Sequence, residues 1–418
     1  MEFDDFLQAV TERPSQREDQ SRAAFERVTI LGGNTDARLL ASLCLANGAS
    51  VKLFSAYASE LEAMQSGIAI NGNGPVGRYH VTAETTSGHA MASAPVSSSQ
   101  NKSIVTTGSL DSCLENAELI FLTGPIHKQR TYAMVLADHL QDGQVLVVPN
   151  ARTFGALEVS WLLQAGGCNA AITIAELQGL PCFVDAQGTA LELQAVTSAA
   201  VACIPARHTR SVVNALSPLL PNLTACTSVL HSSFADCSAV AELPALIVGG
   251  PALSAGGPSI PMGATPLPEN ESFLNLLGTQ QLAVAQLLYD ERVAVARRFG
   301  IRDLPDFSSA IHIAAGAEKG NGRRYVPSQP LALATIRDAV TGSLSPLLDA
   351  AVAAGVETPV TQSMVTLACG ILGADISASG RRLLNLGITD NTFDDTYSRL
   401  SHSAKHGSAS HAAAEDSS

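Results

Sequence analysis

The chain has 418 residues, of which 46% are hydrophobic, 15% charged and 5% aromatic. This apolar content supports a large core and excludes a disordered or fibrous chain, and at roughly 150 residues per domain the length predicts two or three domains. The 38 Asp and Glu residues outnumber the 25 Lys and Arg residues, which gives a net charge of −13. Such an acidic chain repels phosphate backbones, so no nucleic-acid partner is expected.

The cysteines and the two termini bear on compartment and metal content. The eight cysteines form no CxxC pair, so reduced thiols are expected. The acidic N-terminus lacks the apolar segment of a signal peptide, and no apolar run reaches the roughly 18 residues that a membrane span needs. His402, His406 and His411 have a spacing seen in metal sites, but they lie in a tail rich in Ser and Ala that is predicted to be disordered, so we expect no metal site there. We therefore expect a cytoplasmic protein with no metal and no membrane partner.

Strand and helix patterns alternate in the first half of the chain. A polar leader at 1–26 precedes an apolar, β-branched run at 27–31, a glycine-containing turn and a helical pattern that Gly48 closes. A second strand at 51–55 and a helix at 58–66 follow. A strand, a glycine-rich turn, a helix and a strand within about 30 residues are typical of a doubly wound parallel sheet.

Further short apolar runs predict strands at 118–123, 144–148 and 170–176. Residues 82–109 are poor in large apolar side chains and are predicted to form a surface insertion or a long loop. From about residue 208 onward the apolar residues recur with a helical period. The helical patterns cover 236–248, 278–299, 331–353 and 362–373, and a loop is predicted at 249–268.

The predicted fold class is thus an N-terminal Rossmann-like doubly wound parallel sheet followed by an all-α C-terminal domain. The expected parts are a leader at 1–26, a dinucleotide-binding domain at 27–206, a helical substrate and catalytic domain at 207–392, and a disordered tail at 393–418.

The turn after the first strand reads LGGNTDA. A dinucleotide site needs glycine there because the backbone must turn sharply and approach the pyrophosphate, which rests on N–H groups at the helix N-terminus. Gly32, Gly33 and Asn34 supply such a turn, although it is not a full G-x-G-x-x-G and Asp36 lies near the usual third glycine. The sequence predicts a cofactor site here, with a turn that binds nothing as the alternative.

The end of the strand at 118–123 is a second candidate site. Thr123 and Gly124 end this strand, and His127 follows shortly after. Ligands of open α/β sheets bind in the crevice at the carboxyl ends of the strands. We expect Thr123 and Gly124 to contact the cofactor, while His127 has either a catalytic or a structural role.

The choice between NAD and NADP depends on the end of the second strand. An NAD site usually places Asp or Glu there, next to the ribose hydroxyls. This chain has Ser55, and the first acid is Glu60. The missing acid favours NADP, but no Arg or Lys is present nearby to hold a 2′-phosphate, so both cofactors stay open.

Several segments in order resemble the octopine/nopaline (opine) dehydrogenase family over about residues 27–390. They read ILGGN, VKLF, AELIFLTGPIH, DGQVLVVPNARTFGALE, AELQGLP, LLYDERVAVARRFGI, GVETPVTQSM and GRRLLNLGI. The resemblance implies an enzyme that uses NAD(P)H to reduce the imine formed between an amino acid or amine and a 2-oxo acid. It also implies that the Rossmann domain holds the nicotinamide and that the helical domain brings the amino acid and a general acid/base. Separately, we expect a homodimer.

The His–Asp dyad of this family does not appear in the chain. Glu242 falls at the position of the family His, and Gln329 falls at the position of its Asp. We expect Glu242 to be the acid or base, with a pKa that an apolar pocket raises toward neutrality, and Gln329 to orient it. The alternatives are an exposed Glu242 with no role in catalysis, and a catalytic role for His231 or His127 instead.

Arg324, Tyr325 and Glu176 match family positions, and the resemblance implies that they bind substrate. Arg324 is the better candidate for holding a substrate carboxylate with two hydrogen bonds. Arg381 also matches, and we expect it to join helices. Two other functions stay open: a non-redox lyase or cyclase acting on an amino-acid-derived metabolite, suggested by the missing dyad, and a binding protein without activity.

Overall fold

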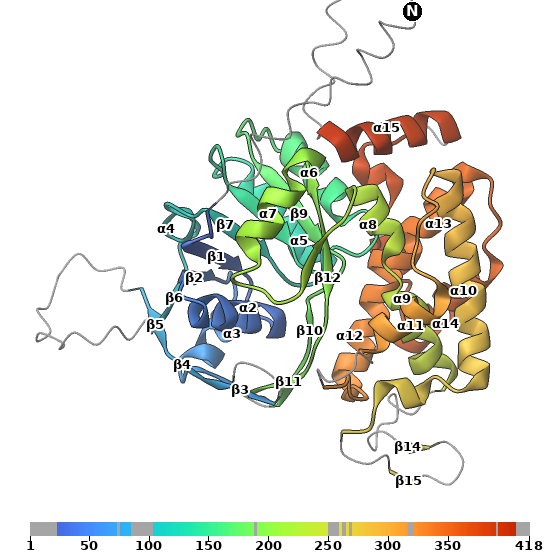
Figure 1. Ribbon diagram of the computed structural model, residues 1–418, viewed down its shortest axis with the longest axis horizontal. Helices are drawn as coiled ribbons and strands as arrows, with labels where there is room; N and C mark the ends of the chain where they lie inside the picture. Colours follow the sequence, from blue (N-terminus) through green and yellow to red (C-terminus); the bar gives the residue numbers. More distant parts are fainter. Residues whose placement is uncertain are drawn as a thin grey trace, which may run out of the picture.

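The computed structural model describes residues 23–72, 76–84, 103–187, 190–249, 259–260, 265–266, 270–316, 322–389 and 392–406. Within these ranges an α/β half and a helical half pack side by side, as Figure 1 shows. The predicted fold class, a Rossmann-like sheet followed by helices, is confirmed.

The α/β half is built on a nine-stranded sheet. In spatial order its strands are β13 (Leu223–Ala225), β12 (Ala199–Ile204), β9 (Thr173–Leu177), β8 (Val145–Val148), β7 (Leu119–Leu122), β1 (Arg27–Leu31), β2 (Ser50–Phe54), β6 (Ile104–Thr107) and β5 (Val81–Ala83). All neighbouring pairs are parallel except β12 with β9. The chain order reverses between β1 and β7, which places a switch-point crevice at their carboxyl ends.

The central strands are apolar throughout because both faces of the sheet are covered. On β7, Ile120 and Leu122 enter one core cluster and Leu119 and Phe121 the other. Helices cover the two faces (Figure 1): α2 (Thr35–Ala46), α3 (Ala58–Met64), α4 (Leu110–Leu114), α5 (Ile126–Leu136), α6 (Gly155–Ala165) and α7 (Thr209–Leu216). The predicted elements at 27–31, 51–55, 58–66, 118–123, 144–148 and 170–176 are confirmed to within a few residues.

A smaller sheet runs below α2 and α3 in the view of Figure 1, with β10 on the side of the helical half. Its strands, in spatial order, are β10 (Cys182–Gln187), β11 (Ala190–Val196), β3 (Ile68–Gly72) and β4 (Gly77–Tyr79). A further pair of two-residue strands, β14 (Ser259–Ile260) and β15 (Thr265–Pro266), lies inside the predicted loop at 249–268.

The helical half has its own core cluster, distinct from the two that cover the sheet. Its main helices are α8 (Val229–Ala235), α9 (Ser238–Leu243), α10 (Thr279–Arg298), α11 (Phe307–Ala315), α12 (Gln329–Ala339), α13 (Ser345–Ala354), α14 (Pro359–Leu372) and α15 (Phe393–His406). Short π-helical turns extend α9 at Pro244–Val248 and join α12 to α13 at Val340–Leu344. The buried Arg381 guanidinium links the two halves, donating to Glu158 Oε2 at 2.8 Å and to the carbonyl oxygens of Ala151 and Thr153.

Two predictions on loops and tails are wrong. The prediction of a loop at 82–109 is wrong for residues 104–107, which form β6, a sheet strand in which the buried Ile104 precedes three smaller β-branched residues. Residues 85–102 of that segment lie outside the described residues. The predicted disordered tail forms α15 up to His406, because Leu400 and Ala404 are buried on one helix face. Residues 407–418, and 1–22 of the leader, lie outside the described residues.

Other predictions concern cysteines, metals and membranes. All eight cysteines are free thiols, as expected. Among the described residues no group of His, Cys, Asp and Glu is placed to hold a metal ion. No single helix of the described chain is long and apolar enough to cross a membrane. Two successive segments, Pro359–Leu372 and Ser377–Leu386, are long and apolar enough when taken together, but they are bent by 107° relative to each other.

Candidate active site

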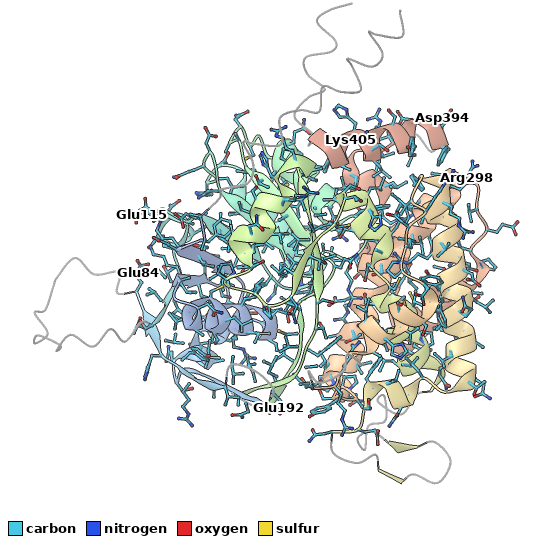
Figure 2. The ribbon with its side chains drawn as sticks, viewed as in Figure 1. Glu84, Glu115, Glu192, Arg298, Asp394 and Lys405 are labelled. Atoms are coloured by element: carbon cyan, nitrogen blue, oxygen red, sulfur yellow. The ribbon has the colours of Figure 1, made fainter. Side chains whose placement is uncertain are left out.

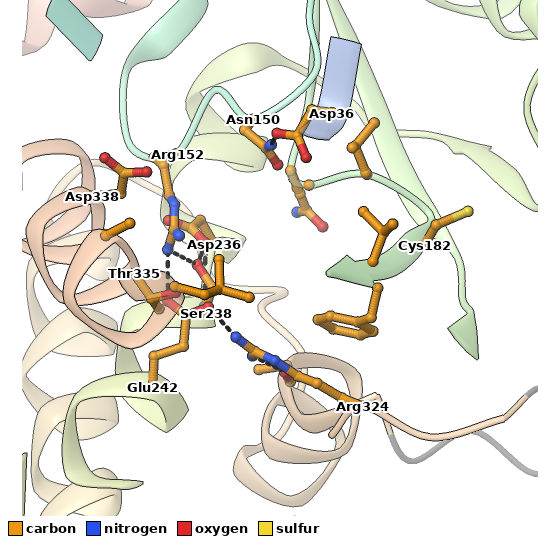
Figure 3. A pocket seen from close by; sticks show the side chains of 18 of the residues that line it. Asp36, Asn150, Arg152, Cys182, Asp236, Ser238, Glu242, Arg324, Thr335 and Asp338 are labelled. Atoms are coloured by element: carbon orange, nitrogen blue, oxygen red, sulfur yellow. Dashed lines mark hydrogen bonds and ion pairs between the residues drawn. The ribbon is translucent and has the colours of Figure 1, made fainter. Parts of the chain in front are cut away.

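A cavity of about 500 Å³ lies between the carboxyl ends of the sheet strands and the helical half (Figure 3). Its sheet side is lined by residues that follow β1, β7, β8 and β9, and its helical side by residues of the α8–α9 segment, α11 and α12. Ligands of open α/β sheets bind at this place in the fold. Of the predicted site residues, it is lined by Asn34, Gly124, His127, Glu242, Arg324 and Tyr325.

The glycine turn is shaped by contacts with the end of β7. Gly32 has a φ of +117°, and a Cβ there would clash with Thr123 Oγ1, so this position requires glycine. Thr123 Oγ1 donates to the Leu31 carbonyl at 2.8 Å and to Asn34 Oδ1 at 3.1 Å. Asn34 caps α2 by accepting from Ala37 N at 3.1 Å. The turn therefore aims the N-terminus of α2 at the cavity.

A carboxylate from α3 closes the other side of this turn. Glu60 Oε2 accepts from Ser55 Oγ at 2.5 Å, and Glu60 Oε1 forms an ion pair with Lys128 Nζ at 2.6 Å. Burial opposes ionisation of Glu60, but hydrogen bonds from Lys128, Ser55 and the Gly33 N–H, with the charge of Lys128, lower its pKa overall. An acid thus sits at the end of β2 although it belongs to the following helix.

Asp36 and Asn150 face the cavity beside the turn (Figure 3). Asn150 Nδ2 donates to Asp36 Oδ2 at 2.6 Å. Burial and the negative charge of Asp338 raise the pKa of Asp36 to about 6, against the lowering effect of Asn150 and Arg152. A carboxyl with this pKa is partly neutral near pH 6, which reduces its repulsion of a diphosphate.

Glu242 joins two arginines across the cavity (Figure 3). Its Oε2 lies 3.0 Å from Arg152 Nη1 and its Oε1 lies 3.0 Å from Arg324 Nη2. The side chain is buried and lines the cavity, so the alternative of an exposed residue is wrong. Burial opposes ionisation, but the charges of Arg152 and Arg324 lower the pKa of Glu242. The expected raised pKa is therefore wrong, because both neighbours are cations.

Both arginines are held by further contacts. Arg152, with a φ of +58°, follows β8 and also donates to Ser238 Oγ at 2.6 Å. Arg324 Nη1 donates to the Ala314 carbonyl at 2.9 Å. The Arg324 guanidinium lies 4.1 Å from the ring centroid of Phe273 and 4.8 Å from that of Phe183. These contacts fix two guanidinium groups at the cavity wall.

His127 and Tyr325 also line the cavity. His127 is the second residue of α5, and burial together with the charges of Lys128, Arg337 and Arg130 lowers its pKa. The Tyr325 backbone N–H donates to Gln194 Oε1 at 2.8 Å.

Three residues predicted to be catalytic or to bind substrate lie elsewhere. Gln329 begins α12 and is not among the described residues that line the cavity. His231 Nδ1 lies 3.0 Å from Cys226 Sγ and its Nε2 lies 3.2 Å from Asp303 Oδ1, away from the cavity lining.

Glu176, the third, lies on β9 and is buried beneath α6, where its Oε2 accepts from Ala156 N at 3.0 Å. Burial raises its pKa to about 7, against hydrogen bonds from the Ala156 N–H and nearby serines. The described cavity lining does not include it. Its contacts hold a helix to the sheet.

Sequence reasoning missed the role of two residues that line the cavity, Arg152 and Asp338. Arg152 lies in the quoted segment DGQVLVVPNARTFGALE, and Asp338 lies in a predicted helix. Neither position has a local pattern that distinguishes a cavity residue from a charged surface residue. A polar residue on an otherwise apolar helix face is the one signal for Asp338.

Comparison with known proteins gives a consistent result. No protein-family model matches the chain. A curated opine dehydrogenase of Arthrobacter sp. (strain 1C) is 24% identical over 301 residues, which cover 68% of this chain and 79% of that protein. The chain is thus similar in sequence to one curated opine dehydrogenase over about two thirds of its length.

Two solved structures have the same fold. Octopine dehydrogenase with NADH and L-arginine matches 88% of this chain and 96% of its own, with a TM-score of 0.61 and 18% identity. D-mandelate dehydrogenase with NADH and anilino(oxo)acetate matches 85% and 99%, with a TM-score of 0.58 and 12% identity. Both of these structures contain NADH, and their likeness to this chain shows a shared fold.

The glycine turn fits such a cofactor. Gly32 has the backbone conformation that the turn requires, and α2 begins at the cavity edge with Asn34 as its cap. A nicotinamide cofactor would lie along this turn and the β7 end at Gly124, where it would supply the hydride.

Proposed function

We propose that the protein is an opine-type dehydrogenase, which joins the amino group of an amino acid or amine to a 2-oxo acid and reduces the resulting imine. The observation that carries this proposal is the pair of guanidinium groups, Arg152 and Arg324, that buried Glu242 holds in the cavity. Both substrates of such a reaction have carboxylates when the amine is an amino acid. Planar guanidinium groups bind carboxylates well, and two of them fixed in one cavity can orient two substrates.

Glu242 has a positioning role in this proposal. A carboxylate with a lowered pKa is a poor proton donor near neutral pH, so its ion pairs serve to hold Arg152 and Arg324 in place. This role differs from the acid/base role that the family position of Glu242 implies. The ring stacking of Arg324 on Phe273 restricts that guanidinium further.

We further propose that the cofactor is NADH rather than NADPH. Glu60 lies beside Gly33 and Ser55, where a ribose diol would find a carboxylate acceptor and where a 2′-phosphate would be repelled. Lys128 is already paired with Glu60. This favours the opposite cofactor from the one that the sequence around Ser55 favours, because the acid comes from the next helix.

The test is an assay that follows NADH oxidation with one 2-oxo acid and a panel of amino acids and amines. The expected product has the mass of the amine plus the oxo acid, minus water, plus two hydrogens. Oxidation of NADH by the oxo acid alone, at the same rate, would indicate a 2-hydroxy acid dehydrogenase instead. Consumption of an amino-acid-derived metabolite without NADH would indicate the lyase or cyclase.

The cellular location and the assembly are proposals of the same kind. We propose a cytoplasmic homodimer. Light scattering on the purified protein would give twice the chain mass, and a monomer that is fully active would contradict the dimer.

A further inference from the structure

The acidic groups that face the cavity differ in how they are held. Glu242 has two arginines as partners, and Asp36 has a hydrogen bond from Asn150. Asp338 is different, because no hydrogen bond or ion pair joins its carboxylate to any described residue. Of these three cavity carboxylates, Asp338 is therefore the one with both oxygens available to a ligand.

The position of Asp338 on α12 explains why it faces the cavity. Leu331, Ala334, Thr335 and Asp338 all line it, and their spacing of three, one and three residues places them on one helix face. Figure 3 shows the Asp338 carboxylate on this helix, opposite the Arg152 guanidinium. The side chain is partly buried and lines the cavity.

Charged groups surround Asp338 from several elements. Arg152 follows β8, Glu242 lies on α9 and Arg337 lies on α12 itself, while the Asp36 carboxyl on α2 interacts with Asp338 across the cavity. Burial raises the pKa of Asp338 to about 6, Arg152 and Arg337 act against this, and Glu242 adds to it. The Asp338 carboxyl therefore changes its charge near pH 6, within the pH range in which enzymes that act on amines and amino acids are assayed.

We propose that Asp338 is the catalytic acid/base of the condensation, the group that takes a proton from the ammonium form of the amine substrate and later gives it to the departing hydroxyl. This inference rests on the proposed function, because it assumes that an amine and a 2-oxo acid meet in the cavity. It assigns to α12 the proton transfer for which the family uses a His–Asp dyad that this chain lacks.

The steps balance as follows. The Asp338 carboxylate takes one proton from R–NH₃⁺, which leaves R–NH₂ and a neutral carboxyl. The amine nitrogen attacks the ketone carbon, the C=O π pair moves to oxygen, and one N–H proton moves to that oxygen to give a carbinolamine. The Asp338 carboxyl then protonates the hydroxyl, the C–O bond breaks, water leaves, and the nitrogen lone pair forms the C=N bond of the iminium ion. Asp338 is again ionised before hydride transfer.

The decisive variant is Asp338→Asn, which keeps the shape of the side chain and cannot carry the proton. We expect kcat for condensation of an amino acid with a 2-oxo acid to fall at least a hundredfold, in line with the size of general acid/base effects. The affinity for NADH should change less than threefold. Asp290→Asn, which removes an exposed carboxylate from α10, is the matched control and should keep wild-type activity.

A substrate that already contains the imine separates this role from a structural one. A cyclic imine with a carboxylate needs hydride transfer but no condensation, so Asp338→Asn should reduce it within about threefold of the wild-type rate. Asp338→Glu should restore part of the condensation rate. In the wild type the condensation rate should fall below about pH 6 as Asp338 becomes protonated, and this limb should disappear in Asp338→Asn.

The outcomes are distinct. Wild-type protein that condenses no amine with any oxo acid contradicts the proposed function. The role of Asp338 alone is overturned if the wild type catalyses condensation and Asp338→Asn does so within threefold of the wild-type rate, with the same loss of rate at low pH. Equal loss of condensation and of cyclic imine reduction also overturns it, since that result indicates a damaged cavity.

Discussion

The cap of α2 on the sheet side of the cavity and the ion pairs of Glu242 on the helical side differ in how far along the chain their contacts reach. On the sheet side, Asn34 caps α2 through an N–H three residues away, and the glycine turn directly follows a strand. On the helical side, Glu242 pairs with Arg152 and Arg324, which are 90 and 82 residues distant. The first kind of contact leaves a local sequence pattern, and the second kind leaves none.

This difference also separates the two kinds of chemistry. The sheet wall provides backbone N–H groups and a helix terminus, which suit a phosphate-containing cofactor. The helical wall, together with Arg152 at the end of β8, provides charged side chains, which suit the substrates and the proton transfers. The glycine turn can thus be kept while the charged groups opposite it are exchanged, because the cap of α2 makes no contact with Glu242 or its two arginines.

The largest expected effect concerns the long-range contacts of the helical wall. Glu242→Gln removes the charge that holds two buried or half-buried guanidinium groups, so Arg152 and Arg324 lose their shared partner. We expect kcat/KM to fall at least a hundredfold, mainly through a raised KM for the oxo acid, and the free energy of unfolding to fall by roughly 3 kcal/mol. Steady-state kinetics and urea unfolding measure the two effects.

A loss in kcat alone, with KM and stability unchanged, would instead support an acid/base role for Glu242. Adding Arg324→Gln to Glu242→Gln should recover part of the lost stability, because the second change removes an unpaired buried charge. The matched control is Asp290→Asn on the surface of α10.

The second effect concerns the local contacts of the sheet wall. Gly32→Val puts a branched side chain at a φ of +117° and against Thr123, so the turn must change shape. We expect the Kd for NADH, read by nicotinamide fluorescence, to rise at least a hundredfold. Gly143→Ala, at a φ of +82° with no atom near its Cβ, is a control for the strain alone. Unchanged NADH affinity in Gly32→Val would place the cofactor elsewhere.

The third prediction tests a buried group behind the sheet wall. The pKa of Glu176 is about 7 in the folded protein, whereas an unperturbed glutamate has a pKa of 4.5. Because folding raises this pKa, ionisation penalises the folded state, and stability should fall by about 2–3 kcal/mol as pH rises from 4.5 to 7. Urea unfolding at about pH 5 and about pH 8 should show this loss in the wild type and much less of it in Glu176→Gln. The same pH dependence in both proteins would assign it to other groups.

The smallest expected effect tests whether the carboxylate of Glu60, on the helix that follows β2, lies beside the ribose of the cofactor. Glu60→Gln removes the carboxylate beside Gly33 and Ser55 and frees Lys128 for a 2′-phosphate. We expect the ratio of NADPH to NADH affinity to rise about tenfold, or about 1.4 kcal/mol. Ser55→Ala, which removes one hydrogen bond but no charge, should change this ratio much less. A constant ratio in Glu60→Gln would show that the ribose lies away from Glu60.

The sequence alone was enough to predict the alternation of strands and helices, the glycine turn, and the place of Glu242 in the crevice. These follow from periodicity, from the backbone needs of a tight turn, and from the resemblance to opine dehydrogenases. Periodicity failed at Ile104–Thr107 and at Phe393–His406. In the first segment small β-branched residues form the strand, and in the second a few apolar residues dock a mostly polar helix (Figure 2 shows the polar side chains of α15, among them Asp394 and Lys405).

Tertiary structure decided the charge state and the partners of the site residues. The apolar neighbours of Glu242 in the sequence predict a carboxyl whose pKa is raised by an apolar pocket, but Arg152 and Arg324 reverse the direction. Glu60 becomes the acid at the end of β2 only because α3 folds back over the turn. The physical reason is that secondary structure depends on neighbours within a few residues, whereas a pKa depends on every charge nearby in space.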